Sequence, residues 1–143
     1  MINGESGTLF LNSASLANDG TIKYFSINNG TTGYEIVFQY TSTSNTVGIR
    51  YINGGFAQCD DSVLITNALD FNKFAFTWQL NKFELWCNGI KVISDTSGSV
   101  TTGFNQIDFR RSNGTIPFFS KVKSVALYNT ALTDQELINL TTI

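Results

Sequence analysis

The sequence contains no histidine. Nucleophilic centres that use an imidazole as base are therefore excluded, and so are the usual zinc sites with imidazole ligands. Glycoside hydrolysis needs no histidine, but a retaining enzyme needs two carboxyl groups about 5 to 5.5 Å apart. Glu35, Glu84 and Asp108 each stand alone in their expected strands, where isolated acids are typically solvated. We therefore expect no enzymatic activity, and a hydrolase is an alternative only if the fold brings distant acids together.

Charged residues are also scarce, at 14% against roughly 25% in typical soluble domains. The nine lysines and arginines form no basic stripe, and the formal net charge is −2. Nucleic acid is therefore not an expected partner. No apolar run approaches the 18 or so residues of a membrane span, and the start of the chain lacks the pattern of a signal peptide. We expect no membrane span, while the cellular location stays open.

Cysteine and proline are nearly missing. Cys59 and Cys87 are the two thiols, and Pro117 is the one proline. Two cysteines are most simply small buried side chains, although a disulfide between them stays an alternative. With one proline, long stretches can join sheet ladders without losing a hydrogen-bond donor.

What the sequence has in abundance is alternation of apolar and polar residues with a period of two, which predicts strands with one buried face. It occurs at 34–40, 47–52, 74–79, 83–88 and 107–110. Between these runs stand turn pairs that tolerate positive φ angles, at 19–20, 29–30, 53–54, 88–89 and 113–114. Because no helices interleave, the pattern predicts an all-β sandwich or barrel, with residues 1–143 as a single domain.

One segment near the end breaks this rhythm. Thr133 followed by Glu136 forms the pattern of a capping box, and Leu132 with Leu137 can form a hydrophobic staple. We expect a short C-terminal helix from about Asp134 to residue 140, closing one edge of the fold.

Two blocks carry a family resemblance. Phe76-Thr77-Trp78 followed by KFELWCNGIKV at 82–92 resembles paired strands of laminin G-like domains in the concanavalin A-like lectin and glucanase superfamily. The block VKSVALYNTALTDQEL at 122–137 resembles that family's last long strand and helix start, although Ser120-Lys121 stands where the family commonly has a glycine.

The resemblance implies a jelly-roll sandwich of two antiparallel sheets that binds a glycan or a cell-surface receptor. It also implies an appended module of a secreted adhesin, phage tail fibre or virion surface protein, and so an extracellular or virion-surface location. The alternative is a structural or assembly domain without a small ligand, as a homo-oligomer or as part of a larger protein.

The family often holds Ca²⁺ with carboxylate, amide and carbonyl oxygens. Asp60-Asp61 is the only adjacent acidic pair, and we expect it in a loop after Gly54-Gly55. It is the candidate calcium site, with a solvated acidic loop as the alternative.

Aromatic residues placed away from the core are candidates for stacking on sugar rings. Trp86 shares a face with Glu84 and Asn88, which could hold sugar hydroxyls, unless a loop or the C-terminal helix covers the indole. A second candidate group near the 53–55 turn comprises Tyr24, Tyr51 and Phe56.

Arg110 and Arg111 precede the turn at 113–114. They could recognise an acidic sugar, or they could be solvated beside a hairpin.

Overall fold

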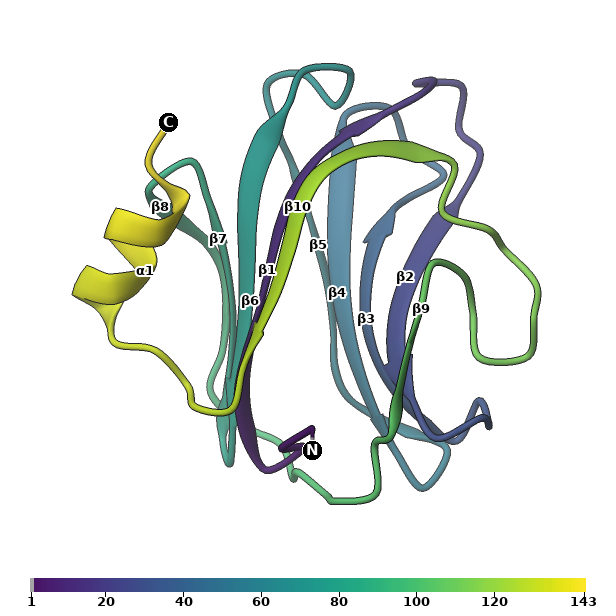
Figure 1. The fold of residues 1–143 in the computed structure, drawn as a ribbon, viewed down its shortest axis with the longest axis vertical. Helices are drawn as coiled ribbons and strands as arrows, with labels where there is room; N and C mark the ends of the chain where they lie inside the picture. The colour runs from purple at the N-terminus through teal and green to yellow at the C-terminus, as the bar shows by residue number, and fades with distance from the viewer. Residues whose placement is uncertain (1) are drawn as a thin grey trace.

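The computed structural model describes residues 2–143 and contains two five-stranded antiparallel sheets (Figure 1). Sheet A has the strand order β10 (Ser120–Tyr128), β1 (Ser6–Ser15), β6 (Asn72–Gln79), β7 (Lys82–Cys87) and β8 (Ile90–Asp95). Sheet B has the order β5 (Phe56–Leu64), β4 (Thr46–Asn53), β3 (Tyr34–Tyr40), β2 (Lys23–Asn28) and β9 (Gln106–Asp108). The predicted all-β sandwich with one short helix is confirmed.

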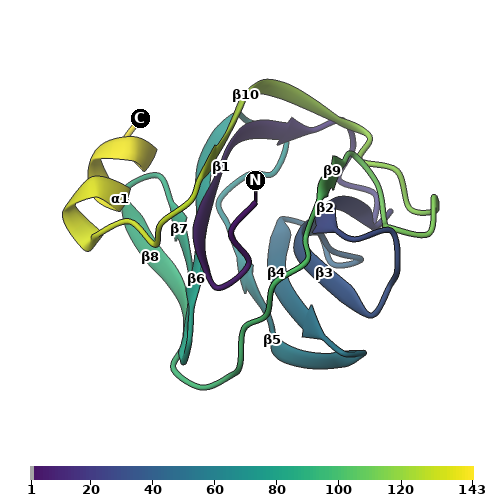
Figure 2. The ribbon, with the colours of Figure 1, turned by 60° about the horizontal axis from the view of Figure 1, so that its bottom comes forward.

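The core lies between the two sheets, which Figure 2 shows facing each other. Alternate residues of each strand enter it, as the period of two requires. Sheet A contributes Phe76 and Trp78, and sheet B contributes Phe38 and Ile49, each at most 1% exposed. Burial of this kind stabilises by about 25 cal/mol per Å² of apolar surface, so these aromatic rings hold the sheets together.

The predicted turns adopt the backbone that their sequences favour. Gly20, Gly30, Gly54, Gly89 and Gly114 all have positive φ. In the hairpin between β7 and β8 both central residues do, with φ of 51° at Asn88 and 86° at Gly89. Two successive positive φ angles match the right-handed twist of the flanking strands, so this turn sets the pairing of Cys87 with Ile90.

The C-terminal helix α1 (Asp134–Thr141) begins as predicted. Thr133 accepts a hydrogen bond from the Glu136 amide at 3.2 Å, and the Glu136 carboxylate accepts one from the Thr133 amide at 3.1 Å. The helix lies on the outer face of sheet A, over β6 and β7. Leu137 is fully buried there, against Ala75 and Trp86. The helix therefore covers the outer face of sheet A, whereas the sequence-based expectation was that it closes an edge of the fold.

Two further sequence-based expectations are corrected. Asp60 and Asp61 lie inside strand β5 and not in a loop, because β5 continues to pair with β4 through this region. Glu35 and Glu84 are not solvated, since they are 0% and 5% exposed.

Both thiols are buried and free. Among residues 2–143, no helix is long and apolar enough to cross a membrane.

Candidate functional site

Trp86 is not available for stacking on a sugar. It is 4% exposed, because α1 covers it, as the alternative interpretation of the sequence held. Its indole nitrogen donates to Glu84 Oε1 at 3.3 Å, and the Lys91 ammonium lies 5.5 Å from the ring centroid and 3.0 Å from Glu84 Oε2. The indole is thus a structural element between sheet A and the helix.

Tyr51 is also excluded as a stacking residue, because its side chain is fully buried in the core. Its hydroxyl donates to the Gly4 carbonyl at 2.5 Å and accepts from the Thr101 amide at 3.0 Å. Burial raises the pKa of Tyr51 to about 12. The hydroxyl therefore ties the N-terminal segment and the 99–102 segment to sheet B.

The other candidates do not converge on one place. Phe56 is 75% exposed at the start of β5. Asn88 is held in its turn, where its amide donates to Asn72 and its carbonyl oxygen accepts from the Lys73 amide, both at 2.9 Å. Arg110 is exposed, and its main-chain carbonyl accepts from Ser26 Oγ at 2.6 Å.

Asp60 and Asp61 point to opposite sides of β5, as successive strand residues must. Asp61 pairs with Ile49 and Asp60 with Arg50 across the β4–β5 ladder. Ile49 is a core residue, so Asp61 lies on the inner side, whereas Asp60 lies on the outer side with Arg50 at 3.4 Å. The two carboxylates therefore cannot hold one calcium ion together, and the predicted Asp60–Asp61 pair is wrong as a shared site.

The structure instead gathers polar side chains on the outer face of sheet B. Cross-strand register sets Ser26, Val37, Arg50 and Asp60 in one row across β2 to β5. A neighbouring row contains Asn28, Glu35 and Ile52. We call this surface the arginine face and define it by Tyr24, Glu35, Arg50, Asp60 and Arg111.

Arg50 stands at the centre of the arginine face. Its Nη1 donates to the Tyr24 hydroxyl at 2.5 Å, and its Nε lies 3.4 Å from Asp60 Oδ2. Burial alone lowers the pKa of Arg50, but the hydrogen bond to Tyr24 and the charges of Asp60 and Glu35 outweigh it and raise that pKa. The guanidinium is therefore a fixed cation whose side chain is 24% exposed.

Arg111 is brought over the same face by the loop that follows β9. Its guanidinium carbon lies 5.8 Å from the Tyr24 ring centroid, and its Nε is 3.6 Å from Glu35 Oε1. Glu35 Oε2 accepts from the Ser112 amide at 3.2 Å, which fixes the loop on the sheet. Within residues 2–143, the two Nη atoms of Arg111 have no hydrogen-bond acceptor, and the side chain is 32% exposed. Arg111 thus presents a free pair of donors at a positioned site.

Sequence reasoning named Arg111, Tyr24 and Asp60 but missed Glu35 and Arg50 as members of one site. Their outward positions in the alternating strands indicate exposure, and only the pairing of Glu35 with Ile52 and Val37 with Arg50 places them side by side. The one feature of the sequence that could have indicated this site is that Glu35 and Arg50 are charged residues at outward strand positions in a chain with few charges.

A separate cavity of about 630 Å³ lies at the N-terminal end of the sandwich. Asn3, Glu5, Phe104, Asn105 and Asn129 line it, with other residues of the same segments. Within residues 2–143 it contains no arginine or lysine. It is therefore a second concave surface, lined by amide side chains and the Glu5 carboxylate in place of guanidiniums.

Comparison with known proteins finds solved β-sandwich structures with the same fold. No protein-family model and no curated protein sequence matches the chain. The CBM40 of the Ruminococcus gnavus IT-sialidase bound to α2,3 sialyllactose superposes with a TM-score of 0.78 at 21% identity, over 99% of this chain and 84% of that chain.

Two further solved structures share the fold. The leech intramolecular trans-sialidase complexed with 2,7-anhydro-Neu5Ac superposes with a TM-score of 0.75 at 22% identity, over 99% of this chain and 24% of that chain. Domain 4 of AbnA, an extracellular arabinanase of Geobacillus stearothermophilus, in complex with arabinotriose, gives 0.74 at 14% identity, over 99% and 69% of the two chains. These likenesses show a common fold.

Proposed function

We propose that this chain is a non-catalytic glycan-binding module that binds its ligand on the arginine face and favours a sugar bearing a carboxylate. The single observation that carries the proposal is the free donor pair of Arg111, held between the Tyr24 ring and the Glu35 carboxylate. A guanidinium fork matches a carboxylate with two parallel hydrogen bonds.

The groups of the arginine face that a ligand can reach are the guanidiniums of Arg50 and Arg111, whose side chains are 24% and 32% exposed, and the Asp60 carboxylate. The residues beneath them on the same side of sheet B are at most 5% exposed and support these charged groups from below: Ser26, Asn28, Val37 and Ile52. The CBM40 of similar fold, which is bound to sialyllactose, supports the same class of ligand.

The alternative of a structural or assembly domain has less support from the chemistry of this face. An assembly surface would place apolar side chains outward, whereas the arginine face places two guanidiniums there, each about a quarter to a third exposed. An extracellular or virion-surface location and membership of the laminin G-like group also belong to this proposal, supported by the two sequence blocks.

The test is a glycan-array screen of the intact chain, followed by calorimetric titration of the best acidic glycan. Arg111→Met keeps the apolar stem but removes the fork, and we expect it to weaken binding about 10- to 100-fold, the worth of a charge-assisted pair. Arg110→Met is the matched control, because this neighbour is exposed and makes only main-chain contacts with the sheet.

A second control addresses the cavity at the N-terminal end. Asn105→Ala alters that cavity and leaves the arginine face intact. Loss of binding in Asn105→Ala with full binding in Arg111→Met would contradict the proposal and move the ligand to the cavity. A blank array for a chain that forms a stable oligomer would favour the assembly domain.

A further inference from the structure

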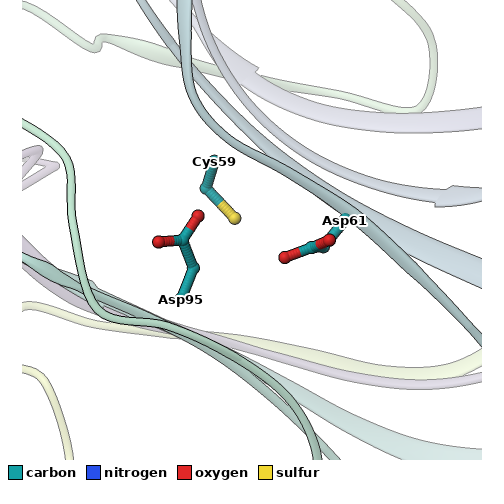
Figure 3. A group of neighbouring side chains, drawn as sticks. All are labelled: Cys59, Asp61 and Asp95. Carbon is teal, nitrogen blue, oxygen red and sulfur yellow. The ribbon is translucent and has the colours of Figure 1, made fainter.

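A cluster of three ligating side chains lies at the edge of the sandwich, on the inner side of sheet B and so on the opposite side of β5 from the arginine face. Cys59 and Asp61 stand on the inner side of β5, and Asp95 ends β8 in the opposite sheet (Figure 3). β5 and β8 are the edge strands of their sheets and contact each other there. One ligand atom from each residue lies within 4.8 Å of the other two.

The thiol is the unusual member of this cluster. Cys59 is 2% exposed, and within residues 2–143 its sulfur makes no hydrogen bond and no disulfide. Figure 3 shows the sulfur directed into the space between the two carboxylates. A buried, unpartnered thiol facing two carboxylates therefore marks this space as distinct from an ordinary solvated acidic edge.

The carboxylates retain free oxygens for a ligand. Asp95 uses Oδ1 to accept from the Ser97 amide at 3.0 Å, and within residues 2–143 Asp61 has neither an ion pair nor a side-chain hydrogen bond. Two like charges this close repel each other, and a divalent cation between them would remove that repulsion.

We propose that Cys59, Asp61 and Asp95 form a binding site for a divalent cation that accepts thiolate and carboxylate ligands together, Zn²⁺ in particular. Three protein ligands leave a fourth position for water, which is the arrangement of open tetrahedral zinc sites. In a tetrahedral zinc site the sulfur and the two carboxylate oxygens would lie about 3.6 Å from one another. They now lie within 4.8 Å of one another, so side-chain movements of about 1 Å would bring them to a bound zinc ion. The site selects against Ca²⁺, which takes six or more oxygens.

Binding has a defined proton balance. The neutral thiol loses its proton to solvent as the sulfur–metal bond forms. One proton is therefore released per metal ion. Because the ligands come from two sheets, only the folded chain assembles the site. Metal binding should therefore stabilise the folded chain, and the melting temperature should rise with the logarithm of the free metal concentration.

The experiment titrates the purified intact chain with Cd²⁺ as the spectroscopic probe, then displaces it with Zn²⁺. We expect a cadmium–thiolate charge-transfer band that saturates at one ion per chain, with one proton released to a weakly buffered indicator solution. Cys59→Ser should abolish the band, and Asp61→Asn and Asp95→Asn should each weaken binding at least 10-fold.

Two controls isolate the site. Asp60→Asn removes an adjacent charge on the other side of β5, and Cys87→Ser removes the other thiol, so both should bind as the parent chain does. Binding that survives both aspartate substitutions, that follows Cys87, or that is carried by Ca²⁺ without Zn²⁺ would overturn the proposal. Glycan binding on the arginine face should not change with chelator, so failure of either proposal leaves the other standing.

Discussion

The helix α1 is expected to hold its place mainly through Leu137. The side chain is fully buried against Ala75 and Trp86, and Leu132, Ile138 and Leu140 surround it. Replacing a buried leucine by alanine costs about 2 to 5 kcal/mol, through lost transfer free energy and the cavity left behind. Here the helix is short and can settle toward Ala75, so we expect the lower part, about 2 to 3 kcal/mol.

The assay for Leu137→Ala is equilibrium unfolding in urea, with tryptophan emission as a second signal. An isolated helix of 8 residues is unstable in water, so loss of its anchor should also loosen its docking and expose Trp86. Trp78 stays fully buried, which makes a red-shifted native emission specific to Trp86. Asn139→Ala, at an exposed position of the same helix, should change the free energy of unfolding by less than about 0.5 kcal/mol.

Two results would refute this reasoning. A Leu137→Ala chain as stable as the Asn139→Ala control would show that the helix contributes no packing. Native emission unchanged by Leu137→Ala would show that Trp86 is shielded by something other than the helix.

Three further predictions concern the core and the arginine face. The pKa of Tyr51 is raised to about 12 in the folded chain, so the stability that its buried neutral hydroxyl contributes is complete below pH 10 and is lost as the pH rises from about 10 to 12. The free energy of unfolding, measured across that pH range, should therefore fall less steeply in Tyr51→Phe than in the parent chain. Glu35→Gln keeps an acceptor for the loop amide but removes the charge facing Arg111, which should cost about 1 to 2 kcal/mol in urea unfolding, and an unchanged midpoint would contradict the ion pair. Gly7→Ala should fail to fold or lose much of its thermal stability, because the added Cβ would lie 2.3 Å from the Trp78 ring, and a normal melting curve would show that the ring can move aside.

Features that depend on neighbours in the chain were predictable from the sequence. The strand rhythm at 34–40 and 74–79 matches β3 and β6, because a period of two follows from strand geometry alone. The Asn88-Gly89 turn and the Thr133 cap were predictable for the same reason, since each needs only a few consecutive residues.

The sequence by itself determined that segments such as 34–40 and 74–79 are strands, where several strands turn, and that chemistry based on histidine is excluded. It did not determine strand β5, where a loop was expected at Asp60-Asp61. Only the tertiary structure decided what covers each outward face. Trp86 and Val37 both point away from the core by alternation, yet both are buried in the folded chain. Helix α1, which is distant in sequence, covers Trp86, whereas Val37 lies beside Arg50 beneath the arginine face.

The grouping of Glu35, Arg50 and Arg111, and of Cys59 with Asp95, likewise depends on which strands pair and which edges meet. Those contacts join residues from different strands and loops. The alternation within one strand carries no information about its partner strand, and this is the physical reason that both candidate sites appear only in the folded chain.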